Sequence, residues 1–290
     1  MRAGQGLTRC ANQLTSPHPR SSHRCTDGLT SSKVDAADMR RIQLDLRSTQ
    51  AELFLDVLRP LLPDTPDGRA IGEWNLEYDV ESLGAEAFER FYAELFQIVF
   101  GRVLGSPTVG FLADETGLFT DFYASFDRVL LAEHSSWFGT QTRQQLFEQA
   151  AARALTGTPR PWGEKRKVVQ QHLMLGGKLP LVFGFDRGPL TLAGGRATPH
   201  QGQIYRSGGR LTTFSPSYRM VTDFAESGWE SCLAVGDEEL AGGTLQTSDS
   251  VLSGQGQKLK PDGRLVEHLS LSRPSNYPAR TMVNGSGMSS

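Results

Sequence analysis

The sequence predicts an α+β fold in which a helical segment is followed by antiparallel strands. Apolar side chains recur at helical spacing as far as about residue 155. From about Leu179 the pattern changes to short apolar runs that are separated by Gly-rich turns. Because helices precede strands and do not alternate with them, we do not expect a βαβ arrangement.

The distribution of aromatic residues places the core in the middle of the chain. Of 25 aromatic residues among 290, 24 lie between Phe54 and Trp229. Residues 1–33 are Ser/Thr-rich with a net charge of +4, and residues 236–290 are rich in Gly and Ser. Such segments bury too little apolar surface to offset their ordering entropy. We therefore expect a disordered basic end (1–33), a folded region (34–235) and a mostly disordered tail (236–290).

The first predicted helix spans about residues 35–60. Asp35 and Asp38 mark its start, and Pro60 and Pro63 mark its end. Its apolar stripe consists of Met39, Ile42, Leu46, Leu53, Val57 and Leu61. We expect a proline-rich turn region over residues 61–72 and a short linker over residues 74–80.

Three further helices are predicted before the strands begin. Ser82 caps the second, which Gly101 and Gly105 close, and its stripe consists of Phe88, Phe91, Tyr92, Leu95, Phe96 and Val99. The third carries Phe119, Phe122, Phe126, Val129 and Leu130, and the fourth carries Leu146, Phe147, Ala150 and Ala154. The predicted strands are residues 181–183, 203–206, 211–214 and 219–224.

Composition excludes several classes of protein. A net charge of −2 and a pI near 6.3 argue against a dedicated nucleic-acid binder. No apolar run approaches the length of a membrane-spanning helix. Cys10, Cys25 and Cys232 do not form a disulfide framework or a zinc motif. The N-terminal segment lacks the apolar run of a secretory signal and resembles a transit peptide only in its Arg/Ser bias, so the localisation stays open.

The histidines and the serine of the folded region do not form a recognisable catalytic or metal site. His134, His172 and His200 have no second His or Cys at ligand spacing. Neither a GxSxG elbow nor a phosphate-binding loop is present. Ser217 has no adjacent base, and we expect the neighbouring Arg219 to pair with a carboxylate such as Asp223. The residues alone therefore predict no catalytic, cofactor-binding or metal-ligating residue.

The remaining glycine and charged motifs are interpreted as structural and not as functional. Gly194 with Gly195, and Gly208 with Gly209, are expected as turns between strands. The basic run formed by Lys165, Arg166 and Lys167 is interpreted as a solvated helix face. Asp45 and Arg47 are interpreted as surface groups on the polar side of the first helix.

Six short segments between residues 38 and 235 occur in the order typical of one enzyme family. They are DMRRIQLD (38–45) with Ser48, EWN (73–75) with Tyr78, Asp79, Ser82 and Ala85, WG (162–163) with His172, FDRGP (185–189), Gly194 and Gly195 with Thr198, and SPSYRMVTD (215–223). Together they resemble the penicillin acylase family of N-terminal-nucleophile hydrolases, in the C-terminal part of the β chain. The resemblance implies a partial αββα fold of that class.

The resemblance also implies an activity. Members of the family cleave the amide bond between an acyl group and an amine, with penicillins, cephalosporins or N-acyl-homoserine lactones as substrates. Their nucleophile is a serine freed by self-cleavage, whose own α-amine acts as the base, and a backbone N–H with an Asn side chain forms the oxyanion hole. Many members bind calcium and are periplasmic or secreted.

The catalytic stretch of the family is not recognisable in this sequence. No Asn-Trp-Asn-Asn-like segment is present, and no calcium ligands can be identified. Arg196 stands where many members have Asp, and Asp237 follows Gly236 where the family usually has a Gly-rich turn and then a Trp-containing tail. We expect a truncated or frame-disrupted product, or half of a split enzyme, that lacks an upstream half.

Two hypotheses follow from these observations. The first is a fragment of a penicillin acylase-like amidohydrolase that is inactive alone and requires the α chain and the β-chain N-terminus as partners. The second is a non-catalytic domain that binds acyl groups or a partner subunit. An upstream reading frame with a cleavage junction would support the first.

Overall fold

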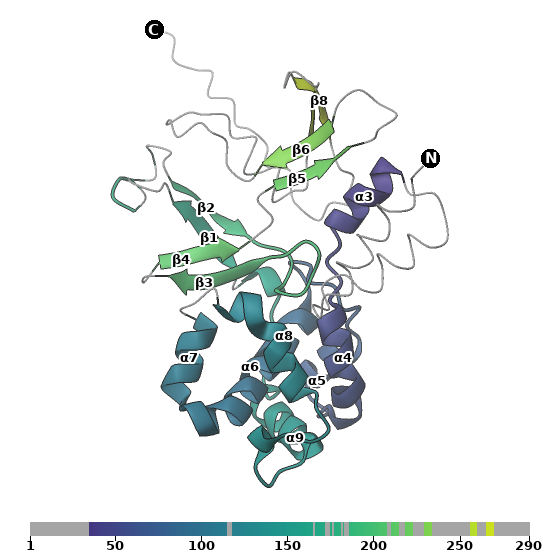
Figure 1. Cartoon of the computed structure of the whole chain (residues 1–290), viewed down its shortest axis with the longest axis vertical. Coiled ribbons are helices and arrows are strands. Elements are labelled where there is room, and N and C mark those ends of the chain that lie inside the picture. The colour runs from purple at the N-terminus through teal and green to yellow at the C-terminus, as the bar shows by residue number, and fades with distance from the viewer. Residues whose placement is uncertain are drawn as a thin grey trace, which may run out of the picture.

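The computed structural model describes residues 35–114, 118–164, 166–171, 175, 177–180, 182, 186–207, 210–214, 218–222, 229–233, 256–259 and 265–269. In this part of the chain all helices except the first gather at one end, and the strands lie at the other end (Figure 1). The α-helices are α3 (Ala36–Gln43), α4 (Thr49–Leu58), α5 (Pro66–Gly72), α6 (Leu83–Leu104), α7 (Ser106–Asp114), α8 (Leu118–Leu130) and α9 (Arg143–Ala154). The 3₁₀ turns are η1 (Arg59–Leu61), η2 (Ser136–Phe138) and η3 (Trp162–Glu164).

The described strands form short antiparallel pairs. They are β1 (Lys167–Gln171), β2 (Asp186–Thr191), β3 (Gln203–Ser207), β4 (Arg210–Phe214), β5 (Tyr218–Val221), β6 (Trp229–Leu233), β7 (Gly256–Leu259) and β8 (Leu265–Leu269). β1 pairs with β2, β3 pairs with β4, and β5 to β8 form a sheet in chain order. In the second pair Gln203 lies opposite Phe214 and Ser207 lies opposite Arg210.

The prediction of one continuous helix over residues 35–60 is wrong, because the chain leaves the helix after α3. The Ser48 hydroxyl accepts a hydrogen bond from the Ala51 N–H at 3.1 Å and so caps a new helix, α4. The residues between the two helices lie along an extended segment, in which the Ser48 N–H donates to Leu76 and the Tyr78 N–H donates to Leu46. Ser48 therefore divides the predicted helix by satisfying the first turn of the second.

Two members of the predicted first stripe do not reach the core. Met39 is 38% exposed and Leu53 is 47% exposed, whereas Leu46 is buried. The break between α3 and α4 changes the phase of the helical pattern, so residues on opposite sides of it do not share one face. Within α4 the buried apolar residues are Ala51, Phe54, Leu55 and Leu58.

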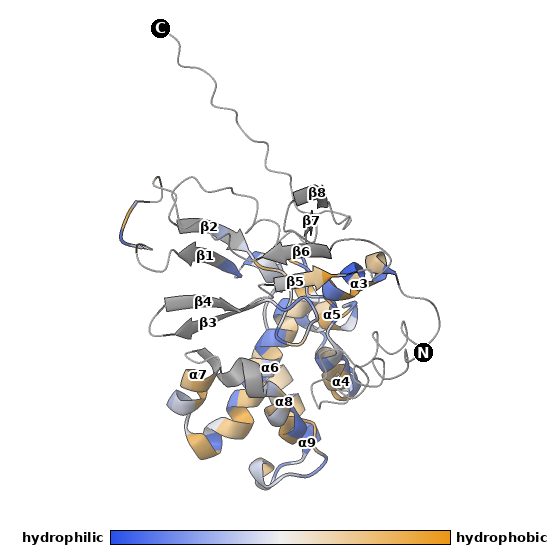
Figure 2. Cartoon of the chain, turned by 45° about the horizontal axis from the view of Figure 1, so that its top comes forward, coloured by the Kyte–Doolittle hydropathy of each residue, from blue (hydrophilic) through white to orange (hydrophobic). Residues whose placement is uncertain are grey.

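Helix α6 confirms the second predicted helix and forms the centre of the core (Figure 2). The Ser82 hydroxyl caps it, and all six residues of its predicted stripe are buried. The helix runs through Gly101 and ends at Gly105, whose φ of 83° lies in the left-handed region that glycine adopts without strain. Phe54, Phe88 and Phe147 bring α4, α6 and α9 into one aromatic cluster, with ring centroids 6.1 Å apart for the two pairs that Phe54 makes.

The regions predicted as a turn and a linker are ordered parts of the helical unit. Residues 66–72 form α5, because Thr65 caps it and Pro66 occupies its first turn. The segment after it buries Trp74, Tyr78 and Val80 against the core. The third and fourth predicted helices are confirmed as α8 and α9, although the side chains of Phe119 and Phe122 lie outside the described residues.

The strand predictions are confirmed in part. β3 and β4 match the predicted strands over residues 203–206 and 211–214, and β5 matches the start of the predicted strand over residues 219–224. The prediction over residues 181–183 is not supported at Val182, which is 87% exposed and outside any strand. β1 and β2 were not predicted, because neither Lys167–Gln171 nor Asp186–Thr191 alternates clearly between apolar and polar residues.

The two ends that we expect to be disordered differ in how far the structure describes them. Residues 1–33 lie outside the described residues. Within the expected tail over residues 236–290 the structure describes β7 and β8, of which β7 pairs with β6 and with β8. These strands cover only part of the tail, and the division of the chain at residues 33 and 235 stays a prediction.

The fold-class prediction is supported in part. The helical segment is the largest ordered part of the described chain, and short antiparallel strand pairs follow it, whereas the αββα arrangement stays a prediction. None of the described helices is long and apolar enough to cross a membrane.

Adjacent positions in α4 provide a test of this core. Phe54 is fully buried among aromatic rings and Leu53 beside it is 47% exposed. Phe54→Ala should lower the free energy of unfolding by about 3–5 kcal/mol, because it removes apolar contacts and leaves a cavity. Leu53→Ala should change it by no more than about 0.5 kcal/mol. Urea unfolding measures both, and equal shifts of the two midpoints would contradict this packing.

Candidate functional site

The loop between β2 and β3 is the most deeply buried irregular segment that the structure describes. Residues 192–198 and 200–202 are all buried. The loop folds back on itself so closely that a Cβ at Gly194 would lie 2.1 Å from the His200 carbonyl oxygen, and one at Gly202 would lie 2.0 Å from the Ala193 carbonyl oxygen. Gly194 also has a φ of 86°. Only glycine fits these two positions, and the predicted turn at Gly194 is confirmed.

Hydrogen bonds fix this loop from inside and from outside. The Thr198 hydroxyl accepts from the Gly195 N–H at 3.0 Å and donates to the His200 carbonyl at 2.7 Å. The Trp162 indole N–H donates to the Gly194 carbonyl at 3.0 Å. The backbone of the loop therefore finds partners although water does not reach it.

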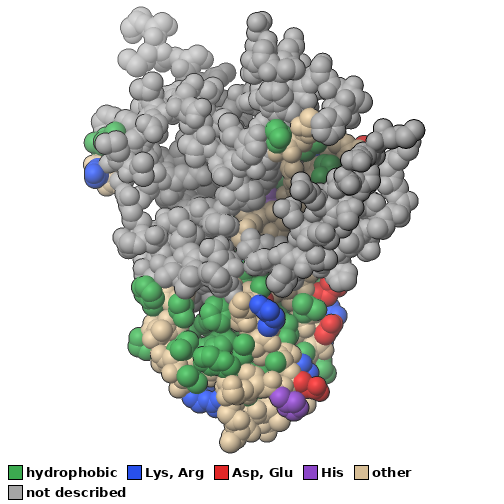
Figure 3. All heavy atoms as spheres, in the orientation of Figure 1, with side chains coloured by type: hydrophobic (Ala, Val, Ile, Leu, Met, Phe, Trp, Pro, Cys, Tyr) green, Lys and Arg blue, Asp and Glu red, His purple; other side chains and the backbone are tan. Residues whose placement is uncertain are grey.

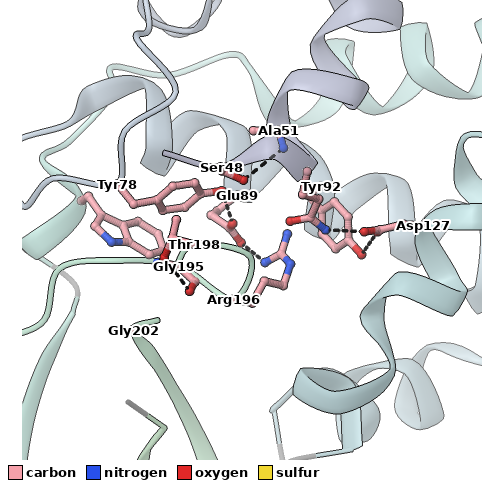
Figure 4. A network of polar contacts seen from close by, with 12 residues as sticks. Ser48, Ala51, Tyr78, Glu89, Tyr92, Asp127, Gly195, Arg196, Thr198 and Gly202 are labelled. Atoms are coloured by element: carbon pink, nitrogen blue, oxygen red, sulfur yellow. Dashed lines mark hydrogen bonds and ion pairs between the residues drawn. The ribbon is translucent and has the colours of Figure 1, made fainter. Parts of the chain in front are cut away.

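A buried ion pair connects the loop to α6 (Figure 4). Arg196, in the loop, lies 2.5 Å from the carboxylate of Glu89, measured from Nη1 to Oε2. The Tyr78 hydroxyl donates to the other carboxylate oxygen of Glu89 at 2.7 Å. Burial, the negative charge of Glu89 and the hydrogen bond to it raise the pKa of Tyr78, so its hydroxyl remains a donor.

A second carboxylate, Asp127 of α8, joins three helices. It accepts from the Tyr92 hydroxyl of α6 at 2.7 Å and from the Gln50 side-chain amide of α4 at 2.7 Å. Burial raises the pKa of Asp127 to about 6, although both hydrogen bonds and the nearby Arg196 act in the opposite direction. Asp127 therefore titrates much closer to neutral pH than an exposed carboxyl group.

Arg196 joins the two halves of this network. Its guanidinium carbon lies 3.9 Å from the centroid of the Tyr92 ring, in cation–π contact. Burial has the largest effect on the Arg196 pKa and would lower it, but Glu89, the two tyrosines and Asp127 together raise the pKa above its ordinary value. Arg196 is therefore a permanent cation between α6 and the loop.

Arg166 corrects one of the sequence interpretations. It follows η3 and precedes β1, so it does not lie on a solvated helix. Its guanidinium packs 4.4 Å from the Trp162 ring centroid, and Nη2 donates to the Gly202 carbonyl at 2.8 Å. Burial, more than the repulsion from Arg196, lowers the pKa of Arg166 to about 10, and Glu89 opposes this shift. The contact with Trp162, which is a tertiary contact, therefore keeps Arg166 off a solvated helix face.

The two neighbouring lysines complete the basic run. Lys167, the next residue, is exposed at the start of β1, and Lys165 lies outside the described residues.

Of the remaining candidate residues, the structure describes the side chains of His134 and His200. His134 is exposed and His200 is buried in the loop. The predictions for His172, Ser217, Asp223 and the pair Gly208 and Gly209, and for the Arg219 side chain, lie outside the described residues or side chains. The part of the chain that the structure describes holds no group of acidic, His or Cys side chains suited to a metal ion.

Asp45 and Arg47 are not simple surface groups on a helix. They lie in the extended segment between α3 and α4, where the Arg47 N–H donates to the Asp45 carboxylate at 3.0 Å. The Arg47 guanidinium pairs with Glu52 at 2.9 Å. The break in the predicted helix placed both residues against the neighbouring extended segment, and this contact could not be inferred from helical periodicity.

The sequence reasoning also missed the buried network itself. Its acidic members, Glu89 of α6 and Asp127 of α8, are not among the residues that the sequence pattern singled out. The available signal was a carboxylate close to an aromatic stripe: Glu89 lies between Phe88 and Phe91, and Asp127 directly follows Phe126. A charged side chain in such a position is rarely buried without a partner, so it indicates a tertiary contact.

Ionisation of Asp127 should weaken the fold as the pH rises. The folded chain holds the Asp127 proton with a pKa of about 6, against an ordinary value of 3.8. Its contribution to stability is therefore complete below about pH 4 and is lost as the pH rises through about 6. Relative to the parent, Asp127→Asn should gain on the order of 2–3 kcal/mol in the free energy of unfolding between pH 4 and pH 7. Both proteins share all other titrating groups, so a difference that does not vary with pH would contradict this account.

The ion pair can be tested against an exposed pair of the same type. Arg196→Met should lower the free energy of unfolding by about 3–5 kcal/mol, because it leaves the Glu89 carboxylate unpaired in a buried site. Adding Glu89→Gln should recover part of this loss. Arg153, which is 57% exposed and lies 3.2 Å from Glu94, supplies the control. Arg153→Met should cost less than about 1 kcal/mol in urea unfolding at pH 7, and equal losses for the two methionine variants would refute the special role of Arg196.

Comparison with known proteins identifies the family of this chain. A sequence model described as penicillin amidase matches residues 5–240. The match covers most of the chain and extends beyond both ends of the segments recognised by inspection. No curated protein matches the sequence. The domain is that of an acylase-like amidohydrolase, and the chain belongs to the penicillin amidase family.

Proposed function

We propose that the chain is part of an enzyme that hydrolyses the amide bond between an acyl group and an amine. The family match over residues 5–240 is the observation that carries this proposal. The substrates we propose are acyl amides of the penicillin, cephalosporin or N-acyl-homoserine lactone type. The described structure supports the proposal through its ordered helical unit, which holds a rigid buried loop.

We further propose that this chain does not supply the nucleophile. In the family, a freed N-terminal serine and an oxyanion-hole Asn perform the chemistry, and the sequence contains no Asn-Trp-Asn-Asn-like segment. Among the described residues, Tyr78 donates to Glu89, which pairs with Arg196, and Asp127 accepts from Tyr92 and Gln50. Their role in this proposal is to hold the loop over residues 192–202 in place, while another segment brings the reacting groups.

An exposed apolar surface supports a second candidate function, that of a subunit-interaction domain. Val103 at the end of α6 is 61% exposed, and Phe111 in α7 is 56% exposed. Hydrophobic side chains gather on the helical part of the molecule in Figure 3. Exposed apolar patches often mark contact surfaces between proteins. A non-catalytic chain of this kind would bind a partner and leave the amide chemistry of that partner unchanged.

Amide hydrolysis by the purified chain tests the proposal that this chain does not supply the nucleophile. We expect no turnover of phenylacetylated, glutarylated or long-chain acyl amides. Loss of one oxyanion-hole donor alone costs on the order of 10²–10³ in rate. Loss of a nucleophile together with its base costs on the order of 10⁶. A chain without all these groups should not exceed the rate of the buffer.

Complementation separates the two candidates. A polypeptide that carries the freed serine and the oxyanion Asn of a family member should restore hydrolysis when it is co-expressed with this chain. Binding without hydrolysis would favour the interaction domain. Turnover by the chain alone that is lost in Ser217→Ala would overturn the proposal and place the nucleophile at Ser217.

A further inference from the structure

We propose that Arg166 anchors a binding site for a small-molecule carboxylate beside the buried loop over residues 192–202. The site concerns binding alone and goes beyond the proposed hydrolase role. Its components are the Arg166 guanidinium, the Trp162 ring on which it packs, and the Gly202 carbonyl that positions it.

The Arg166 guanidinium has hydrogen-bond donors without a partner. Its Nε atom is buried and has no hydrogen-bond partner. Its Nη2 atom donates to a neutral carbonyl, that of Gly202. Within the described part of the chain, Arg166 forms no ion pair with a carboxylate. A buried guanidinium that has only an indole face and one carbonyl as partners lacks a counter-ion, which is costly in a protein interior.

The described carboxylates of the network are engaged with other partners. Glu89 is held by Arg196 and Tyr78. Asp127 is held by Tyr92 and Gln50. The attraction of Glu89 acts on Arg166 more strongly than the repulsion from Arg196, but burial outweighs both and lowers the pKa of Arg166 to about 10. A bound anion would supply a counter-charge in direct contact with the guanidinium, which the described carboxylates do not.

The geometry of the guanidinium edge favours a carboxylate over a spherical anion. The Nε–H and an N–H of Nη2 lie on one edge of the planar guanidinium, and Gly202 takes only one of the two hydrogens on Nη2. A carboxylate presents two oxygens at matching spacing and binds such an edge through two parallel hydrogen bonds. A halide ion has no such geometry. Arg166 as a whole is only partly buried, although its Nε atom is shielded from water.

The test is thermal unfolding of the full chain in the presence of sodium acetate or sodium phenylacetate. Each acid should raise the midpoint saturably, by roughly 3–6 °C at ten times its Kd. Sodium chloride at the same ionic strength, and neutral acetamide, should not produce the saturable rise.

Variants then assign the effect to Arg166. Arg166→Met should abolish the response to acid and, in its absence, should unfold at the same or a higher temperature than the parent, because the variant no longer buries an unpaired charge. This second readout distinguishes a ligand site from a structural arginine, whose removal would lower the midpoint. Arg153→Met should keep the full acid response. A response that persists in Arg166→Met, an equal response to chloride, or no response to either acid would overturn the proposal.

Discussion

The ion pair between Arg196 and Glu89 is the contact on which the arrangement of loop and helices depends. It joins a loop from the strand-rich part of the chain to the central helix α6, and the side chains of Arg196 and Glu89 are 6% and 20% exposed. A carboxylate or a guanidinium left alone there would be very unfavourable, so the two elements must come together for either charge to be buried. The cation–π contact with Tyr92 extends this constraint towards α8, because the same tyrosine donates to Asp127.

Around this pair, apolar packing supplies the bulk of the stabilisation and polar contacts supply the alignment. The aromatic cluster of α4, α6 and α9 is non-directional, since ring contacts tolerate several arrangements. A hydrogen bond from Gln50 or Tyr92 to Asp127 is directional and fixes how α4 and α6 lie against α8. The raised pKa of Asp127 shows that this alignment is obtained at the expense of some stability near neutral pH.

Arg196, which is buried, and Arg166, which is partly buried, illustrate different uses of the same side chain. Arg196 has a carboxylate partner and an aromatic face, and its charge is stabilised. Arg166 has an aromatic face and a carbonyl, and burial lowers its pKa. This contrast separates a structural cation from one that is suited to an external anion. In a member of the penicillin amidase family, a carboxylic acid is also one product of the proposed reaction, so the chemistry of the inferred ligand and that of the proposed enzyme are compatible.

The sequence by itself determined the central helix, its cap at Ser82 and its buried aromatic face, because these depend on periodicity and on hydrogen bonds within a few residues. It also determined the family, through short segments in a fixed order. Only the tertiary structure decided that the first helix breaks at Ser48 and that Arg166 packs on Trp162. The partners of Glu89 and Asp127 come from positions far away in the chain: Arg196 lies 107 residues after Glu89, and Gln50 lies 77 residues before Asp127. Such contacts depend on how the helices and the loop pack, and local sequence carries no record of that packing.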